Sequence, residues 1–319
     1  MHSFTFDDNS LLPALYGRED EHLLLLEKNT DTKINYRGNH LEIFGESNNC
    51  INVGLILKNL YARLKEGSEI SLGDVEGELK MTIGKTENVS GEPVYITTSK
   101  RKIVARSLNQ KLYLNLMKEN SLVFAIGPAG TGKTYLAVAA AVQSLLNGEV
   151  NRIILSRPAV EAGERLGFLP GDLKDKVDPY LRPLYDALYD MLPAEIVFRK
   201  LESGEIEVAP LAFMRGRTLA NAYIIVDEAQ NTTPMQMKML LTRIGENAKM
   251  VVTGDLSQID LSDNQLSGLK QATEILKKID DIAFVKFNSK DVVRNQLVIK
   301  MVEAYENSEK KLKLMKEIK

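Results

Sequence analysis

The fold is decided by Leu122-Val-Phe-Ala-Ile-Gly127-Pro-Ala-Gly130-Thr131-Gly132-Lys133-Thr134. Five apolar residues of strand type, 122–126, lead into the spacing G-x-x-x-x-G-K-[ST]. An Ala-rich apolar segment, 135–146, then reads as a helix that ends at Asn147-Gly148. The stretch therefore predicts a buried strand, a phosphate-binding loop and a helix, in that order.

The glycines of this loop predict a cradle for the phosphates of a nucleotide. Glycine lets the backbone turn tightly and aim successive N–H groups inward, at the positive end of the following helix. We expect Lys133 to neutralise the β- and γ-phosphates and the Thr134 hydroxyl to bind Mg²⁺. A tight loop without a ligand is the alternative, which the flanking strand and helix disfavour. The expected nucleotide-binding residues are Gly127, Pro128, Ala129, Gly130, Thr131, Gly132, Lys133 and Thr134.

The composition is that of a soluble globular protein, with 319 residues, 44% hydrophobic, 26% charged, and a formal net charge of -2. This length predicts two domains, and the net charge argues neither for nor against nucleic acid as a partner. Cys50 is the only cysteine, which fits a reducing interior. The first residues lack the layout of a signal peptide, and no apolar run reaches membrane-spanning length. We therefore expect a cytoplasmic protein without membrane contact.

Residues 1–85 are expected to form a small α+β domain. The segments 34–36 and 41–43 alternate like paired strands around the turn Arg37-Gly38-Asn39. A helix is expected from Ser47 to Gly67, and a second, short helix from Ser71. The first helix is expected to bury one apolar side, formed by Ile51, Leu55, Leu60 and Leu64.

Residues 86–102 read as a linker with one strand at 94–97. Its basic stretch, Ser99-Lys-Arg-Lys102, is either solvated or a contact for nucleic acid.

Residues 103–319 alternate between expected strands and helices, which predicts a parallel sheet covered on both faces. Because a carboxylate follows Asp227 directly and a Thr-Gly-Asp strand comes later, we expect strand 249–253 to lie between strands 122–126 and 223–226. The tract 157–171 reads as a structured loop. The remaining expected elements are strands at 152–156, 205–209 (an edge strand) and 282–287, and helices at 180–192, at 234–244 and from about Asp291.

A second signature, Asp227-Glu228-Ala-Gln230, follows the apolar run Tyr223-Ile-Ile-Val226. An acid at the end of a buried strand that faces the phosphate loop can hold a water of Mg²⁺, which is the role expected of Asp227. Glu228 can then polarise the attacking water. Together they indicate hydrolysis, whereas the alternative of an exposed acidic strand end would not explain the phosphate loop.

Two further strings resemble motifs of superfamily 1 helicases. Thr253-Gly-Asp255-Leu-Ser-Gln258 resembles their third motif, so Asp255 and Gln258 are expected to sense the γ-phosphate; an ordinary strand-turn is the alternative. Leu108-Asn109-Gln110 resembles their adenine-reading Gln motif. The alternative there is a helix-capping Asn109 beside a surface Gln110.

Longer strings resemble the PhoH family of bacterial ATPases, over about residues 100–300. This resemblance implies a RecA-type core that uses Mg-ATP, links to RNA metabolism and ribosome maturation, and a hexameric ring in relatives. The domain before it is similar to the KH-like N-terminal part of the PhoH-like subgroup. The strings are Ser156-Arg-Pro-Ala-Val-Glu-Ala-Gly-Glu, Leu166-Gly-Phe-Leu-Pro-Gly, Pro179-Tyr-Leu-Arg-Pro-Leu-Tyr-Asp, Phe213-Met-Arg-Gly-Arg-Thr-Leu, Asp227-Glu-Ala-Gln-Asn-Thr-Thr and Thr253-Gly-Asp.

The chain departs from the family pattern in two places. His-Pro commonly follows the arginine of the stretch that here reads Asp291-Val-Val-Arg294-Asn295-Gln296. Arg294 is kept and is expected to stabilise the transition state in a neighbouring subunit of the ring; the alternative is an arginine at a helix start that pairs with a nearby acid such as Asp291. The N-terminal domain lacks the G-x-x-G clamp of RNA-binding KH domains, so packing or partner binding is as plausible for it as RNA contact.

The sequence thus predicts a RecA-like α/β P-loop ATPase core with a parallel sheet and a small α+β KH-like N-terminal domain. ATP and Mg²⁺ are the expected ligands and RNA the expected partner. Arg157, Arg215 and Arg217 are either contacts for nucleic acid or members of internal salt bridges. The alternative function is a nucleotide-dependent interaction module with slow hydrolysis. The expected catalytic residues are Lys133, Glu228, Asp255, Gln258 and Arg294.

Overall fold

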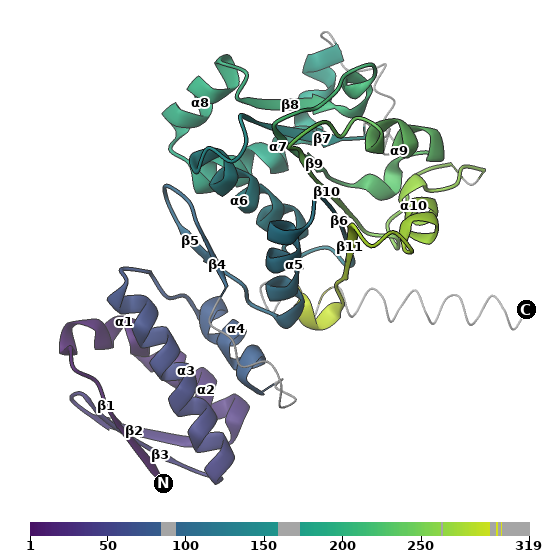
Figure 1. Ribbon diagram of the computed structural model, residues 1–319. Helices are drawn as coiled ribbons and strands as arrows, with labels where there is room; N and C mark the ends of the chain where they lie inside the picture. The colour runs from purple at the N-terminus through teal and green to yellow at the C-terminus, as the bar shows by residue number, and fades with distance from the viewer. Residues whose placement is uncertain (84–93, 159–172, 263, 294–297, 299–300, 302–319) are drawn as a thin grey trace, which may run out of the picture.

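The chain folds into two parts with separate hydrophobic cores, seen in the computed structural model of Figure 1. The structure describes residues 1–83, 94–158, 173–262, 264–293, 298 and 301. One core takes all its buried residues from the segment 6–79. The other two clusters of buried residues lie on the two faces of one sheet and come from residues 96–287.

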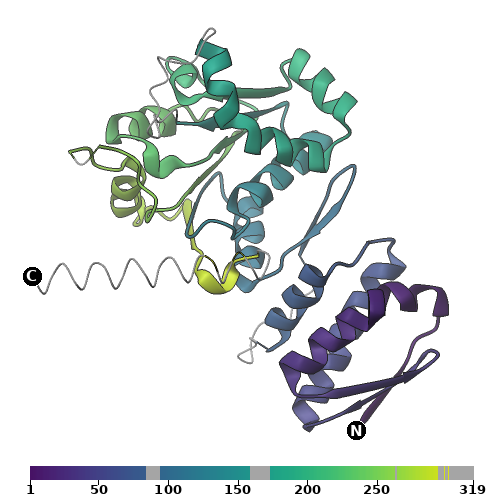
Figure 2. The same cartoon turned by 180° about the vertical axis from the view of Figure 1, so that it is seen from behind.

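The N-terminal part is a three-stranded antiparallel sheet with helices over one face (Figure 2). The strand order is β1-β3-β2, and the hairpin expected around residues 37–39 is confirmed. The small α+β domain is therefore correct in class, while its likeness to KH domains stays a prediction. Its elements are β1 (His2–Thr5), α1 (Leu12–Tyr16), α2 (Glu21–Thr30), β2 (Lys33–Arg37), β3 (His40–Phe44), α3 (Ser47–Lys65) and α4 (Leu72–Ile83).

The buried side of α3 differs from the prediction, because Ile51 and Leu55 are exposed. The buried side instead follows the spacing of Cys50, Val53, Leu57 and Leu60. Gly54 lies on this side, and an added Cβ there would lie 2.0 Å from Cζ of Phe4. Because Gly54 has no side chain, the ring of Phe4 from β1 packs directly against the backbone of α3. The sequence analysis did not predict strand β1.

The C-terminal part is built on a six-stranded parallel sheet in the order β11-β6-β10-β9-β7-β8. Strand β10 pairs with β6 on one side and with β9 on the other, which confirms the predicted central position of residues 249–253. This order is RecA-like, and the predicted fold class is confirmed. The strands are β6 (Leu122–Ile126), β7 (Arg152–Arg157), β8 (Ile206–Pro210), β9 (Ala222–Val226), β10 (Lys249–Gly254) and β11 (Ile282–Lys286).

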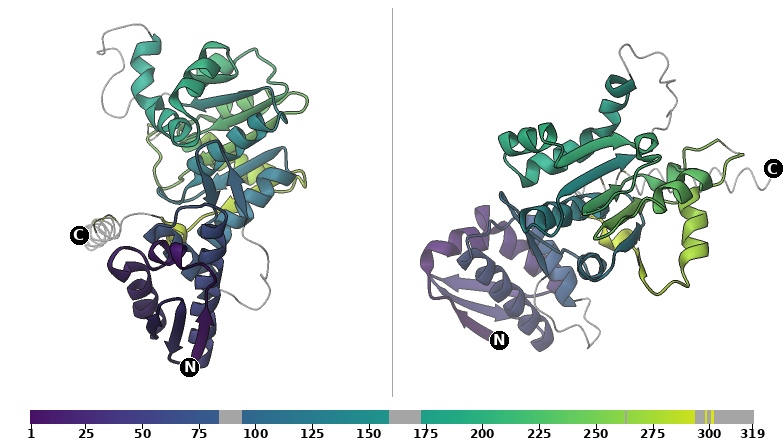
Figure 3. Two further views of the ribbon diagram at one scale, coloured as in Figure 1. Left: turned by 90° about the vertical axis from the view of Figure 1, so that its left-hand side faces the viewer. Right: turned by 45° about the horizontal axis from the view of Figure 1, so that its top comes forward.

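Helices cover both faces of this sheet, since alternate side chains of each strand enter different clusters (Figure 3). One face carries α5 (Leu108–Glu119), α6 (Lys133–Leu146), α7 (Leu173–Met191) and α8 (Ala194–Glu202), and the other α9 (Pro234–Leu241) and α10 (Gly268–Leu276). Helix α9 ends three residues earlier than predicted, and the predicted terminal helix and most of the tract 157–171 lie outside the described residues. No helix in the described ranges is long and apolar enough to cross a membrane.

A hairpin stands where the sequence predicted a linker with one strand. It is formed by β4 (Tyr95–Thr97) and β5 (Lys102–Val104), and it buries Ile96 and Ile103 against the sheet domain. The basic side chains at and beside the tip of this hairpin contact other residues of the same chain. Lys100 Nζ donates to the carbonyl of Tyr189 (2.7 Å), Arg101 pairs with Asp190 (2.7 Å) and Lys102 pairs with Glu66. These contacts favour a structural role for the stretch over a role in nucleic-acid binding.

The two parts meet at a partly buried cluster of one carboxylate and two arginines. The Asp74 carboxylate on α4 lies 2.9 Å from Nη2 of Arg63 and 3.3 Å from Nη2 of Arg106, which follows the hairpin. Burial is the largest influence on the Asp74 carboxyl and opposes its ionisation, but Arg106, Ser71 and Arg63 together outweigh it, and the pKa of the carboxyl stays below its usual value. The side chain of Arg106 lies against Gly77, where an added Cβ would approach it to 2.9 Å.

Gly54→Ala tests the docking of β1 on α3. Replacing a helical glycine with alanine usually raises the free energy of unfolding by about 1 kcal/mol. Here the added methyl group would overpack against Phe4, so the substitution should instead lower the free energy of unfolding by about 1–3 kcal/mol. Urea unfolding followed by circular dichroism measures the change. In a Phe4→Ala background the same substitution should be stabilising; stabilisation in the presence of Phe4 would contradict the contact.

Candidate active site

The phosphate loop, residues 127–132, lies at the carboxyl edge of the parallel sheet, between β6 and α6. Gly127 and Gly132 both have positive φ, 152° and 81°, a region that favours glycine. An added Cβ at Gly127 would also lie 2.5 Å from the carbonyl oxygen of Phe287. The loop conformation thus depends on glycine at both positions, as the sequence motif requires.

The side chain of Lys133 lies back over the loop. Its Nζ donates to the carbonyl oxygens of Gly127 (2.6 Å) and Pro128 (2.8 Å). Thr131 is fully buried and donates from Oγ1 to the same Pro128 carbonyl (2.9 Å). The ammonium group is thereby held above the turn that the motif assigns to phosphate.

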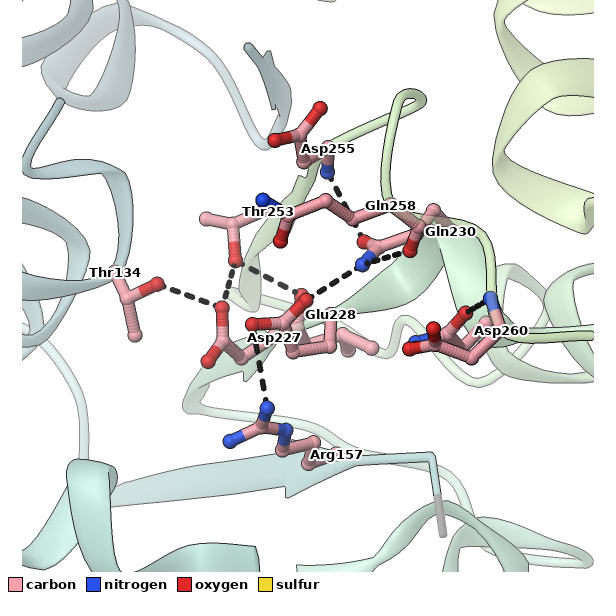
Figure 4. A network of polar contacts seen from close by, with 11 residues as sticks. Thr134, Arg157, Asp227, Glu228, Gln230, Thr253, Asp255, Gln258 and Asp260 are labelled. Carbon is pink, nitrogen blue, oxygen red and sulfur yellow. Dashed lines mark hydrogen bonds and ion pairs between the residues drawn. The ribbon is translucent and has the colours of Figure 1, made fainter. Parts of the chain in front are cut away.

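Asp227 joins three parts of the site, as Figure 4 shows. Its Oδ1 accepts hydrogen bonds from the hydroxyls of Thr134 (2.6 Å) and Thr253 (2.7 Å). The predicted metal-binding pair, Thr134 and Asp227, is therefore brought together, and Thr253 is an additional partner that the sequence reasoning did not assign. Because β10 lies between β6 and β9, its Thr253 can bridge this space.

Hydroxyl and carboxylate oxygens are the hard donors that suit Mg²⁺, so Thr134 and Asp227 fit this ion. Within the described ranges no cluster of three or more His, Cys, Asp or Glu side chains could hold a metal. An ion at Thr134 therefore needs phosphate oxygens and water to complete its shell. When bound, it supplies charge neutralisation for the phosphates.

Glu228 adopts a left-handed backbone conformation, with φ 52°, which is unusual for a residue with a side chain. Its Oε1 lies 3.2 Å from Nη2 of Arg157, and its Oε2 accepts a hydrogen bond of 2.5 Å from Nε2 of Gln230 (Figure 4). Both oxygens of the expected water-activating carboxylate are therefore engaged. The sequence analysis gave an internal salt bridge as one alternative for Arg157 but did not name Glu228 as its partner.

Gln230 is a fully buried connector that was not predicted. Its Oε1 accepts from the backbone N–H of Asp255 (3.0 Å), and its Nε2 also donates to the carbonyl of Gln258 (3.1 Å). The side chain thus ties Glu228 to the loop that follows β10. The signal available in the sequence was its position, two residues after Glu228 in the same motif.

Asp255 presents one satisfied and one unsatisfied oxygen. Oδ1 accepts from the N–H (2.9 Å) and Oγ (2.6 Å) of Ser257, while Oδ2 is buried without a hydrogen-bond partner among the described residues. A buried, unsatisfied acceptor is costly and is typical of a functional position. This arrangement fits the expected sensing role.

Lys133, Thr134, Asp227, Glu228 and Asp255 line one cavity of 680 Å³, a size typical of small-molecule sites. Helix α7 forms an unpredicted wall, where Asp190 accepts a hydrogen bond of 2.6 Å from the hydroxyl of Tyr135. Burial, reinforced by this bond, raises the pKa of Tyr135 to about 12. The predicted residues that line the cavity are Ala129, Gly130, Gly132, Lys133, Thr134, Asp227, Glu228, Asp255 and Gln258.

Gln110 lies outside the lining of this cavity and is buried behind the loop. Its Oε1 accepts from the N–H of Arg106 (2.6 Å), and its Nε2 donates to the carbonyl of Thr131 (3.0 Å). Adenine reading by Gln110 stays a prediction. The alternative of a surface Gln110 after a capping Asn109 is wrong, because Ser107 caps α5.

The three arginines of the loops have different surroundings. Arg157 pairs with Glu228, and Arg217 pairs with Glu207 through two contacts of 2.5 and 2.7 Å, so internal salt bridges account for both. Arg215 is exposed. Arg294 lies outside the described residues, and its role stays a prediction.

Comparison with known proteins identifies relatives along most of the chain. A PhoH-like protein of Bacillus subtilis is 51% identical over 297 residues, which cover 92% of this chain and 93% of the relative. A PhoH-like protein of Synechocystis is 49% identical over 300 residues and covers 93% and 92%. The helicase domain of Hef from Pyrococcus furiosus overlaps with a TM-score of 0.36 at 14% identity, over 57% of this chain and 38% of that one.

The fold assignment rests on the strand order, and the family assignment on the sequence relatives and on a family profile. The profile of the PhoH-like protein family matches residues 102–306, which span the sheet, the phosphate loop and the Asp227 motif. The chain belongs to the PhoH-like protein family.

Proposed function

We propose that this protein is a cytoplasmic Mg²⁺-dependent ATPase whose hydrolysis is coupled to RNA. The observation that carries the hydrolytic part is the Thr134–Asp227 hydrogen bond of 2.6 Å, with Glu228 next in the chain and on the same cavity as Lys133. A metal-binding hydroxyl, an acid for the metal's water and a second carboxylate for the attacking water are thereby assembled.

The proposed roles follow from the contacts. Lys133 exchanges loop carbonyls for phosphate oxygens, which are the stronger acceptors because they are charged. Glu228 orients and deprotonates the attacking water. Asp255 and Gln258 respond to the γ-phosphate, and Gln230 transmits that response to Glu228 because it contacts all three residues.

Lys133→Ala and Glu228→Gln should separate binding from chemistry. Loss of the ammonium should weaken ATP binding by about 10- to 100-fold, since charge-assisted hydrogen bonds to phosphate are lost. Loss of the Glu228 carboxylate should not weaken ATP binding and should reduce kcat by about 10²- to 10⁴-fold. Titration with a fluorescent nucleotide and steady-state kinetics measure the two effects.

Glu207→Gln is the matched control, because Glu207 also pairs with an arginine but does not line the cavity. It should leave both nucleotide affinity and kcat unchanged. Equal loss of nucleotide affinity in Lys133→Ala and Glu228→Gln would contradict the role given to Glu228.

The RNA part of the proposal is supported by the PhoH resemblance and by one exposed feature. Phe213 is 51% exposed in the 3-10 turn Leu211–Met214, directly after β8, and exposed Arg215 follows it. An exposed aromatic ring beside an arginine can stack a base and contact a backbone phosphate. Because β8 is parallel to the other strands, this pair lies at the same edge of the sheet as the phosphate loop.

Phe213→Ala and Arg215→Ala should each weaken binding of a single-stranded RNA oligonucleotide. Loss of base stacking typically costs about 1–3 kcal/mol, so the Phe213 variant should lose about 5- to 150-fold in affinity. Fluorescence anisotropy with a labelled oligonucleotide measures the change, and Phe198→Ala, which removes a similarly exposed ring on α8, is the control.

The competing function is a nucleotide-dependent interaction module that hydrolyses ATP slowly. RNA-stimulated turnover distinguishes the two, because only the RNA-coupled ATPase should show it. Wild-type protein that hydrolyses ATP at the same rate with and without RNA would favour the interaction module.

We further propose a hexameric ring in which Arg294 completes the site of a neighbouring subunit. The support is the family resemblance, together with a single phosphate-loop motif in the sequence and a single parallel sheet among the described residues. An arginine from outside the cradle can contribute about 10³- to 10⁵-fold in rate.

Glu228→Gln and Arg294→Ala proteins should therefore each be inactive alone and partly active when co-assembled. Some interfaces of the mixed ring then pair an intact Glu228 with an intact Arg294. ATPase assays on mixtures over a range of ratios measure this complementation. A mixed oligomer as inactive as its parents, or a fully active native monomer, would refute action between subunits.

A further inference from the structure

The ion pair between Arg157 and Glu228 lies inside the cavity, where no other role has been given to the guanidinium. Arg157 ends β7 and Glu228 follows β9, and these strands pair with Ser156 opposite Val226. The two side chains are 24% and 31% exposed, so the pair is partly accessible to solvent. Both residues line the 680 Å³ cavity together with Lys133 and Thr134.

The charges around this cavity are unbalanced. Among the described residues that line it, Lys133 and Arg157 are the two cations. Five lining residues are carboxylates, namely Asp186, Asp190, Asp227, Glu228 and Asp255, of which Asp190 is already paired with Arg101 from the hairpin. A polyphosphate added beside these acids needs positive charge, and among the described lining residues Arg157 is the cation that remains after Lys133.

The same pair limits Glu228. Each oxygen of the Glu228 carboxylate already has one partner, since Oε1 faces Arg157 and Oε2 accepts from Gln230, whereas a general base must direct one oxygen at the water. The contact with Arg157 can be exchanged without any change to Gln230, which holds the loop after β10. A guanidinium leaves a carboxylate readily only for another anion of matching geometry, and phosphate has that geometry.

We propose that Arg157 is a γ-phosphate-binding residue of its own subunit, which pairs with Glu228 in the absence of a triphosphate and moves to the γ-phosphate when ATP binds. This exchange frees Glu228 for water only when the substrate is present. It also makes Arg157 the residue that distinguishes ATP from ADP. The proposal rests on the ATPase function proposed above and adds to it a residue within the same chain.

Arg157→Gln tests the proposal through binding alone. The dissociation constants of ADP and of a non-hydrolysable ATP analogue are measured by fluorescence titration, with Mg²⁺ and without RNA. ADP affinity should stay within about twofold of wild type, while affinity for the ATP analogue should fall by about 10- to 100-fold, as expected for a lost charge-assisted hydrogen bond. The preference for ATP over ADP should therefore largely disappear.

Arg217→Gln is the matched control. It breaks an Arg–Glu pair of similar exposure outside the cavity and should change neither constant. Thermal unfolding of both variants verifies that they are folded, and Arg157→Lys, which keeps the charge, should recover part of the preference.

Glu228→Gln provides a second, opposite prediction. Without the competing carboxylate the guanidinium is more available, so the ATP analogue should bind about two- to fivefold more tightly, the range of a weak ion pair. Arg157→Gln combined with Glu228→Gln should show no such gain. This cycle isolates the exchange from any general effect of either substitution.

Three outcomes would overturn the proposal. Equal loss of ADP and ATP-analogue affinity in Arg157→Gln would mean that the residue only supports the cavity. Unchanged nucleotide affinities with weakened RNA binding would assign the guanidinium to a nucleic-acid phosphate. If wild-type protein bound neither nucleotide, the ATPase function itself would fall, and the role of Arg157 with it.

Discussion

One carboxylate oxygen fixes the geometry of the site. Oδ1 of Asp227 accepts hydrogen bonds from Thr134 at the start of α6 and from Thr253 at the end of β10. These contacts require β10 to lie between β6 and β9, with the carboxyl ends of all three strands at one edge. The order of the central strands, the orientation of the phosphate loop and the position of the acid therefore depend on one another.

The polar network continues from this point through one uncharged side chain, that of Gln230. Gln230 bridges Glu228, Asp255 and Gln258, and it is fully buried, so its hydrogen bonds are made in a region of low dielectric where loss of one partner is costly. Glu228 itself has a strained backbone, with φ 52°, and strain of this kind persists only where the surroundings hold it. A buried amide and the surroundings of a strained acid thus fix the position that we propose for water activation.

The sequence predicted the parts of this site that local chemistry determines. The loop glycines, Lys133 and Thr134 follow from one spacing, and the order of the central strands follows from the motifs at their ends. Contacts between segments far apart in the chain could not be read in this way. The pairing of Arg157 with Glu228, the wall that α7 contributes and the hairpin at 95–104 all depend on packing across the sheet. The buried side of α3 was predicted wrongly for a related reason. Gly54 lies on that side but has no side chain, so the sequence pattern gave no apolar residue there to indicate it.

The N-terminal domain is connected to the phosphate loop by a continuous set of contacts. Asp74 on α4 holds the guanidinium of Arg106, the N–H of Arg106 donates to Gln110, and Gln110 donates to the carbonyl of Thr131 in the loop. Each link is at least partly buried, so water does not readily replace it. A displacement of α4 relative to the sheet must therefore either break the Asp74–Arg106 pair or move the backbone of Arg106 and with it the brace behind the loop. Both ends of the Gln110 amide are occupied by these contacts. The position of Gln110 is therefore explained by its support of the loop, whether or not it also contacts adenine.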